Sequence, residues 1–196
     1  MKFKIGALLI SSFVLFASSA LADKTILAGG CFWCMESDFE KLDGVTGVVS
    51  GFSGGTLKNP TYSGNHSGHY EVVEVTYDPK KVSYQAILDH YWVNVDPFDS
   101  RGQFCDKGDS YLSAVFVANE QERKIAEQSK SNIMAQFPGQ KVVTPILDAT
   151  TFYPIKGRES HHQDFYKKSP IRYTAYRWNC GRDKRLKAIW GDKTTH

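Results

Sequence analysis

Long apolar runs are scarce in this sequence, and the one that exists lies at the start of the chain. In a chain of 196 residues, the run from Ile5 to Phe16 is the most apolar, and small residues interrupt it. It is too short to span a bilayer comfortably, and no later stretch is apolar enough to do so. The sequence therefore argues against a protein with several membrane spans.

The residues that flank this run indicate export. Lys2 and Lys4 precede it, and Ala20 and Ala22 follow it with the small-x-small spacing of a cleavage site. A basic start, an apolar middle and small residues at the end are typical of a secretory signal peptide. We expect residues 1–22 to be removed after Ala22 and the product to be periplasmic or secreted. An uncleaved membrane anchor is the alternative.

An excess of charge of one sign is also lacking. The formal net charge is +3 at pH 7, and removal of Lys2 and Lys4 lowers it to +1. A nearly neutral protein gives no electrostatic reason to propose nucleic acid or an anionic membrane as its partner. Because no repeat, low-complexity segment or linker divides the chain, we expect residues 23–196 to form a single domain and a monomer.

Cysteine is rare, and its four positions leave several functions open. They are Cys31, Cys34, Cys105 and Cys180. In an exported protein the simplest expectation is two structural disulfides, which would suit a secreted binding module. The C-x-x-C spacing of the first two also permits a general thiol–disulfide oxidoreductase.

A zinc site is a further possibility for the first two cysteines. His66 and His69 are the histidines that would complete it. Structural zinc sites use short and regular ligand spacings, whereas the gap between Cys34 and His66 is long and flexible. We therefore expect no metal.

Apolar periodicity predicts an α+β domain. The expected strands are residues 25–28, 45–52, 71–77, 113–118 and 142–153, and the expected helices are residues 34–42, 83–95, 119–137 and about 159–167. From about residue 169 the chain reads as an irregular basic tail. The order of the first six elements matches a ferredoxin-like split βαβ plait, in which helices cover one face of an antiparallel sheet.

Two glycines place Cys31 at a tight turn between a strand and a helix. Gly29 and Gly30 let the backbone turn, so that Cys31 lies at or just before the helix N-terminus. Free N–H groups and the helix dipole stabilise an anion there. We therefore predict a lowered pKa for Cys31 and a nucleophilic thiol.

Glu71 gives an independent indication of chemistry. On its strand it shares a face with Val73, Val75 and Tyr77, which are apolar. A carboxyl group on an apolar face should have a raised pKa and keep its proton near neutral pH. The alternative is that Glu71, at the end of its strand, reaches water. A protonated carboxyl near a thiol suits a reaction that donates a proton to a leaving oxygen.

Five short segments resemble, in order, those of the peptide methionine sulfoxide reductases of the A class. They are Gly30-Cys31-Phe32-Trp33, Asn59-Pro60-Thr61-Tyr62, Ser67 to Val73, Asp106-Lys107-Gly108 with Tyr111, and His162-Gln163-Asp164. The resemblance covers nearly the whole chain after residue 22. It implies reduction of methionine-S-sulfoxide, free or in proteins, and so a role in protein repair after oxidation.

The resemblance also implies a role for each residue of the reacting centre. Cys31 would attack the sulfoxide sulfur and become a sulfenic acid, and Glu71 would protonate the sulfoxide oxygen. Tyr62 and Tyr111 would hydrogen-bond that oxygen, and Asp106 would fix the substrate or the tyrosines. Phe32, Trp33 and Tyr173 would wall the substrate pocket.

The cysteine that resolves the sulfenic acid is left open. Many members carry it directly after the tyrosine at position 173, where this chain has Thr174. Cys180 is the main candidate because a tail can move into the site, and Cys34 is its competitor; Cys105 is either part of a relay or inert. A second thiol reduces a sulfenic acid to a disulfide, which an external thioredoxin-like reductant then opens. No bound cofactor is expected.

Overall fold

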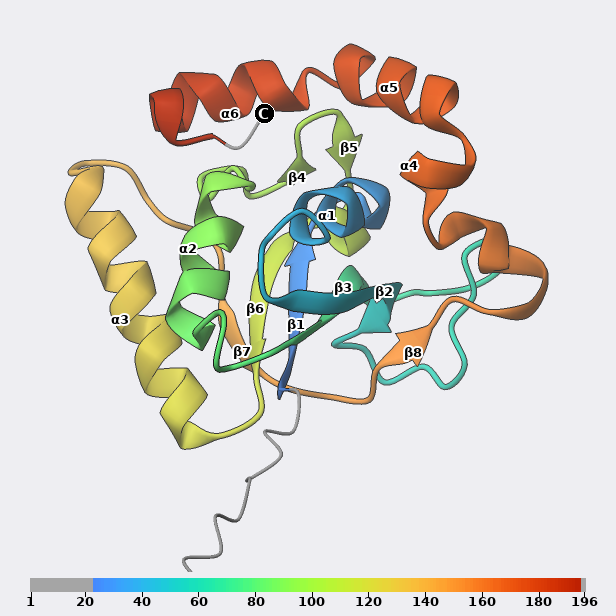
Figure 1. The fold of residues 1–196 in the computed structure, drawn as a ribbon, viewed down its shortest axis with the longest axis horizontal. Helices are drawn as coiled ribbons and strands as arrows, with labels where there is room; N and C mark the ends of the chain where they lie inside the picture. The colour runs from blue at the N-terminus through green and yellow to red at the C-terminus, as the bar shows by residue number, and fades with distance from the viewer. Residues whose placement is uncertain (1–22, 195–196) are drawn as a thin grey trace, which may run out of the picture.

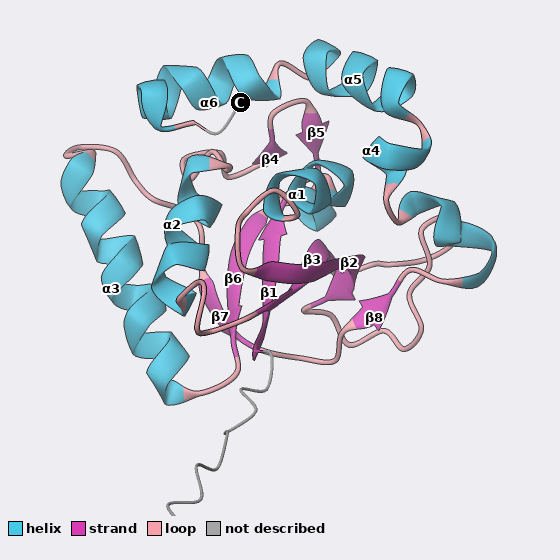
Figure 2. Cartoon of the chain, in the orientation of Figure 1, coloured by secondary structure: helices cyan, strands magenta, loops and turns pink. Residues whose placement is uncertain are grey.

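The computed structural model describes residues 23–194, so the predicted signal peptide lies outside the described residues. Figure 1 and Figure 2 show strands β1 (Asp23–Gly29), β2 (Val45–Ser53), β3 (Tyr70–Tyr77), β4 (Gly102–Gln103), β5 (Asp106–Lys107), β6 (Ser113–Val117), β7 (Ile146–Asp148) and β8 (Tyr153–Pro154). The helices are α1 (Phe32–Phe39), α2 (Tyr84–Val93), α3 (Glu120–Gln136), α4 (Phe165–Lys168), α5 (Pro170–Asn179) and α6 (Arg182–Trp190). Short 3₁₀ helices are η1 (Asp109–Tyr111), η2 (Gly157–His162) and η3 (Gly191–Lys193). In this part of the chain, no helix has both the length and the apolar character to cross a membrane.

The central strands confirm the predicted plait. Between residues 23 and 194 the main sheet has six strands in the order β7-β6-β1-β3-β2-β8. The inner four come from β1-α1-β2-β3-α2-β6, and each is antiparallel to its neighbour among them. This is the order of a split βαβ unit with its second helical crossover. β8 adds to one edge as an antiparallel strand, and β7 to the other as a parallel strand.

Alternation along the strands gives the sheet two apolar faces. Leu27, Val73 and Val115 pack into the main core together with α1, α2 and α3. Their chain neighbours, such as Ala28 and Val72, form a second cluster on the opposite face. Successive side chains of a strand point to opposite faces. Where a strand is covered on both faces of the sheet, it therefore needs apolar residues on both of them.

Helix α2 shows how an apolar pattern and an N-cap residue determine where a helix forms. Its N-cap is Ser83, whose hydroxyl accepts a hydrogen bond from the Ala86 N–H at 3.1 Å. The buried side chains follow the predicted stripe at i, i+3 and i+4; they are Tyr84, Ile87, Leu88, Tyr91 and Trp92. The predicted helix over residues 83–95 is thereby confirmed, with boundaries one or two residues shorter.

The strand predicted over residues 142–153 is wrong in extent. Only Ile146–Asp148 and Tyr153–Pro154 form strands. Pro145 has no N–H to donate to a ladder, and the N–H of Val143 bonds to Pro97 in a loop instead. β-branched composition alone suggested a continuous strand, but these bonds and the irregular segment 149–152 interrupt it.

The predicted irregular tail is also wrong, because residues 170–190 form α5 and α6. Pro170 occupies the first turn of α5, and Gly181 separates the two helices with a φ of 68°. Arg177 and Arg182 face inward and reach the buried Asp38 of α1, at 2.8 and 3.7 Å. In Figure 1 the two helices lie across the end of the molecule where α1 and the β4–β5 hairpin are found.

Candidate active site

A pocket of about 230 Å³ opens where the N-terminus of α1 meets the start of β3 and the helical tail. Its lining residues are Cys31, Phe32, Trp33, Tyr62, Glu71, Asp106, Tyr111 and Tyr176. The fold therefore brings together residues from five separate segments. All the residues predicted to surround the substrate line it except Tyr173, and Tyr176 is an addition.

The turn at Cys31 requires its glycine. Gly30 has a φ of +81°, and a Cβ at this position would lie 2.6 Å from the Gln103 Cβ. Cys31 is the N-cap residue of α1, and its carbonyl accepts the N–H groups of Cys34 and Met35. The predicted placement of the thiol at the helix N-terminus is confirmed.

The predicted direction of the Cys31 pKa is wrong. The residue is only 6% exposed, and burial raises the pKa of its thiol well above the ordinary value. Cys34 and Glu71 raise it further, whereas a hydrogen bond with Tyr176 lowers it. Desolvation outweighs the helix N-terminus here, so Cys31 rests as a thiol.

Cys34 has the opposite tendency. A hydrogen bond from Cys31 lowers the pKa of Cys34, burial opposes this shift, and the positive charges of Arg182 and Arg177 lower it further. Cys31 and Cys34 are thus a buried pair of free thiols that share a hydrogen bond. This contradicts a module stapled by two disulfides.

Glu71 has the predicted surroundings. It is 1% exposed, and burial raises its pKa to about 8, although hydrogen bonds from the Phe32 N–H and from Tyr111 oppose the shift. The Phe32 N–H donates to Oε2 at 3.2 Å, which holds the carboxyl group beside the turn that carries Cys31. At pH 7 the group is mainly protonated and can donate a proton into the pocket.

The two predicted phenols also stay protonated. Burial and the nearby acids raise the pKa of Tyr62 to about 12 and raise that of Tyr111 as well. The loop that carries Tyr62 is held by Glu159, whose Oε2 accepts the Tyr62 N–H at 2.9 Å. Both hydroxyls can therefore act as hydrogen-bond donors in the pocket.

The apolar wall is held by the end of η2 and the residues that follow it. The Trp33 indole donates to His162 Nδ1 at 3.1 Å and its ring stacks on Phe165 with centroids 4.0 Å apart. Gln163 bonds both the N–H and the carbonyl of Ser50 in β2, at 2.8 and 2.7 Å. These contacts explain the His162-Gln163-Asp164 motif as a clamp that fixes the pocket wall to the sheet.

Tyr176, not Tyr173, reaches the pocket from the tail. The Tyr176 hydroxyl donates to Asp106 Oδ2 at 2.5 Å, and burial raises its pKa. Tyr173 packs behind Cys34, and its hydroxyl accepts a hydrogen bond from Arg177 at 2.9 Å. Sequence reasoning missed Tyr176 because the tail was not predicted to be helical; in a helix, Tyr176 and Cys180 lie one turn apart on one face.

The other two cysteines form a disulfide. Cys105 and Cys180 are bonded, with a Cα–Cα distance of 4.9 Å and 75 residues between them in sequence. Cys180 Sγ lies 3.9 Å from Asp106 Oδ2, so the bridge borders the pocket. The predicted main candidate for resolution is therefore not a free thiol in this state.

The histidines of the zinc alternative are engaged elsewhere. His69 is buried, with Nδ1 accepting the Gly55 N–H at 3.2 Å and Nε2 bonded to the Leu57 carbonyl at 2.9 Å. His66 stacks on Phe52 and bonds the Thr61 carbonyl. Because both ring nitrogens of His69 are used, it has no lone pair left for a metal shared with Cys31 and Cys34.

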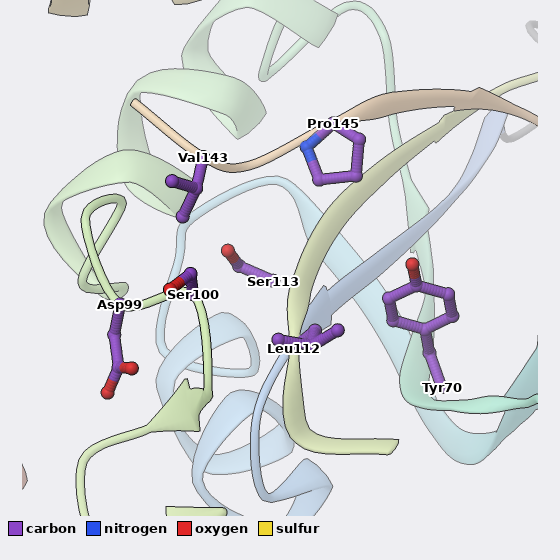
Figure 3. Close-up of a pocket in the computed structure, with 7 residues that line it drawn as sticks. All are labelled: Tyr70, Asp99, Ser100, Leu112, Ser113, Val143 and Pro145. Carbon is purple, nitrogen blue, oxygen red and sulfur yellow. The ribbon is translucent and has the colours of Figure 1, made fainter. Parts of the chain in front are cut away.

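Another hollow, of about 150 Å³, lies at the edge formed by β6 and the loop before β7. Figure 3 shows its lining residues, which are Tyr70, Asp99, Ser100, Leu112, Ser113, Val143 and Pro145. Asp99 is paired with Lys107, which lowers its pKa, and the lining contains no thiol. Among the described residues, the first pocket brings together the Cys31 thiol, a protonated carboxyl group and phenols, with the free thiol of Cys34 beside Cys31, and these groups define a cysteine-dependent redox enzyme.

Comparison with known proteins assigns the family. The family model described as "Peptide methionine sulfoxide reductase" matches residues 23–194. The chain is 49% identical to "Peptide methionine sulfoxide reductase MsrA 2" of Caulobacter vibrioides, covering 89% of this chain and 90% of that one. It is 45% identical to the MsrA of Bacillus licheniformis, covering 85% and 92%. The chain belongs to the peptide methionine sulfoxide reductase family.

Solved structures agree with this assignment. Mxr1 of Saccharomyces cerevisiae in its reduced form is 26% identical and superposes with a TM-score of 0.71, covering 79% of this chain and 89% of that one. Methionine sulfoxide reductase A of Corynebacterium diphtheriae is 29% identical with a TM-score of 0.65, covering 79% and 78%.

Proposed function

We propose that the pocket reduces methionine-S-sulfoxide to methionine, in free and protein-bound form, with Cys31 as nucleophile and Glu71 as proton donor. One observation carries this proposal: a buried thiol and a carboxyl group with a pKa of about 8 face the same small pocket. A sulfoxide oxygen leaves poorly until it is protonated, so a neutral acid beside the thiol supplies what the reaction needs.

The first step transfers an oxygen atom. Cys31 sulfur attacks the sulfoxide sulfur while Glu71 protonates the oxygen, with Tyr62 and Tyr111 as further donors. The attack forms a transient bond between the two sulfurs; this bond and the S–O bond of the substrate break as the oxygen passes to Cys31, which becomes a sulfenic acid, and methionine leaves. The thiol proton returns to Glu71, so that one thiol and one sulfoxide give one sulfenic acid and one thioether. Asp106 orients this centre through its bond from Tyr176.

The second step uses Cys34. Its thiol attacks the sulfenic sulfur of Cys31, which forms a Cys31–Cys34 disulfide and releases water. Cys34 is the better candidate than Cys180 because it is free and already hydrogen-bonded to Cys31, whereas Cys180 is bonded to Cys105. Its lowered pKa also favours attack.

An external dithiol completes the cycle. Two electrons from a thioredoxin-like protein reopen the Cys31–Cys34 disulfide, and dithiothreitol replaces that protein in vitro. With the signal peptide predicted at residues 1–22, we expect this repair of oxidised proteins to take place in the periplasm or outside the cell.

The direct test is an assay with dabsyl-methionine-S-sulfoxide and dithiothreitol, with the R epimer as the matched control. We expect product from the S epimer only. Cys31→Ser should abolish it, whereas Cys34→Ser should still form one methionine per enzyme without reductant. Folded wild-type protein that forms no methionine, or Cys31→Ser with full activity, would refute the proposal.

A general thiol–disulfide oxidoreductase is the second candidate, because Cys31 and Cys34 are free and adjacent. It predicts reduction of insulin that is lost in Cys34→Ser. The raised pKa of Cys31 argues against it, since such enzymes need a stable thiolate at the first cysteine.

A further inference from the structure

Tyr176 is a pocket residue that belongs to the tail. It lies near the end of α5, lines the pocket with Cys31, and hydrogen-bonds both that thiol and Asp106 Oδ2, the latter at 2.5 Å. A phenol has one proton, which Tyr176 donates to Asp106 at rest and can donate to the sulfur when the Cys31 thiol loses its own proton. Such a donor stabilises charge where it develops, in a site from which water is largely excluded.

The disulfide lies directly beside this contact. Cys180 follows Tyr176 by four residues, one turn along the same face, and Cys105 directly precedes Asp106. The same two segments are therefore linked twice, by the Cys105–Cys180 bond and by the Tyr176–Asp106 hydrogen bond. The Cys105 N–H also lies 3.2 Å from Cys180 Sγ.

Two anchors fix α5 at this end, a buried ion pair and the disulfide. The helix has ten residues, of which only Tyr173 and Arg177 are buried, while Ile171 and Trp178 are 85% and 79% exposed. A helix of this length is marginal on its own and takes its position from tertiary contacts. Arg177, in the last turn of α5, pairs with Asp38, and the Cys105–Cys180 disulfide joins the end of the helix to the segment that carries Asp106.

We propose that the Cys105–Cys180 disulfide is a positioning device for the active site, which holds Tyr176 against Cys31 and Asp106. The proposal rests on the proposed function and makes Cys180 a positioning residue instead of a resolving one. It also makes full activity depend on an oxidised bridge, although neither bridge sulfur takes part in the reaction.

The test is a double-mutant cycle on a single turnover of methionine-S-sulfoxide without reductant. Tyr176→Phe should slow methionine formation roughly tenfold to a hundredfold. Replacing both bridge cysteines, Cys105→Ser with Cys180→Ser, should slow it roughly twofold to tenfold, as expected for coupled neighbours. In the Tyr176→Phe background the same replacement should have no further effect, and Thr174→Ala, on the exposed face of α5, should react like the wild type.

Two results would overturn the proposal. One is an equal loss in both Tyr176 backgrounds, which would mean that the bridge acts through general stability. The other is an unchanged single turnover together with a loss of steady-state turnover only, which would make Cys180 a relay cysteine.

A second readout needs no change to the bridge and no sulfoxide. The pH dependence of Cys31 alkylation by iodoacetamide, located by mass spectrometry, reports how easily this thiol loses its proton. Titratable groups that face Cys31 are Cys34, Tyr62, Glu71, Asp106, Tyr111 and Tyr176. In Tyr176→Phe we expect the midpoint to move to higher pH, since one hydrogen bond that lowers the Cys31 pKa is lost.

The same shift should follow reduction of the bridge in wild-type protein with tris(2-carboxyethyl)phosphine. A midpoint that moves in Tyr176→Phe but not on bridge reduction would refute the positioning role. Because alkylation requires no sulfoxide, this result stands even if the protein fails to reduce methionine sulfoxide.

Discussion

The two cysteine pairs of this protein show how surroundings decide the chemistry of a thiol. Cys31 and Cys34 occupy the first turn of α1, are buried, and remain free. Cys105 and Cys180 lie at the rim, join segments 75 residues apart, and are bonded to each other. The first pair has a protonated acid and phenols as neighbours, whereas the second borders Asp106 at the edge of the pocket.

This difference suits the first pair to redox chemistry and the second pair to support of the structure. A short C-x-x-C pair closes a small loop, so its disulfide adds little to stability and can be opened and closed in each cycle. A bridge over 75 residues restricts the unfolded chain strongly. Most variants below should affect mainly one pair, whereas Asp38→Ala should affect both, and the sizes of the effects show how far the two regions are independent.

Glu71→Gln should give the largest effect, and only at the first pair. Without a proton donor, kcat/KM should fall roughly 10²- to 10⁴-fold. In the wild type the rate should decline as pH rises through about 8, because Glu71 loses its proton there, and the variant should lack this decline. A pH–rate profile checks both points; unchanged profiles would exclude Glu71 as the acid.

The folding stability should also depend on pH through Glu71. The folded pKa of Glu71 lies above its ordinary value of 4.5, so folding binds a proton between the two values. Its contribution to stability is present below the unfolded pKa and is lost as pH rises through the folded value. Urea unfolding at several pH values should show this loss in the wild type and not in Glu71→Gln.

Asp38→Ala should damage both regions, because Asp38 links α1 to α5 and α6. The carboxylate and its partners Arg177 and Arg182 are buried, so its removal takes the buried counter-ion from both arginines and leaves Arg177 paired only with Asp183. We expect a loss of about 3–5 kcal/mol in urea unfolding. Asp183→Ala is the matched control: it removes an exposed partner of the same Arg177, and a loss above about 1 kcal/mol there would contradict this interpretation.

Cys105→Ser with Cys180→Ser should destabilise the protein by about 2–4 kcal/mol through loss of the long loop constraint. The free energy of unfolding in urea, without reductant, measures this. Cys34→Ser is the comparison, and we expect it to change stability much less because no bond is lost there. Equal losses would remove the distinction between the pairs.

Tyr62→Phe should give the smallest effect. Removing one of several donors to the sulfoxide oxygen should lower kcat roughly fivefold to tenfold, since one hydrogen bond contributes about 1 kcal/mol. Tyr153→Phe, in β8 outside the pocket, should leave kcat unchanged. A loss as large as that of Glu71→Gln would mean that Tyr62 is itself the proton donor.

Much of the fold could be predicted because the spacing of apolar residues in the sequence agrees with which side chains are buried. Residues 71–77 alternate as expected, and the stripe of α2 is buried as expected. The tail could not, because its helices are held by buried arginines. From sequence alone, charged residues such as Arg177 and Arg182 are expected to be exposed to solvent. Only the structure shows that they point inward and pair with Asp38.

The site was predictable where residues share a local element and less so where distant segments meet. The Cys31 turn and the buried side of Glu71 follow from glycine and strand parity. The rise in the Cys31 pKa does not, since it depends on how many atoms of the whole fold exclude water from the thiol. The pairing of Cys105 with Cys180 likewise could not be predicted, because it depends on where the helical tail lies.

Mass spectrometry of the intact disulfides after one equivalent of methionine-S-sulfoxide, without reductant, tests the central claim most directly. The account predicts a new Cys31–Cys34 disulfide, one methionine released, and an unchanged Cys105–Cys180 bridge. A bond between Cys31 and Cys180, or methionine release with Cys31 still a free thiol, would contradict it.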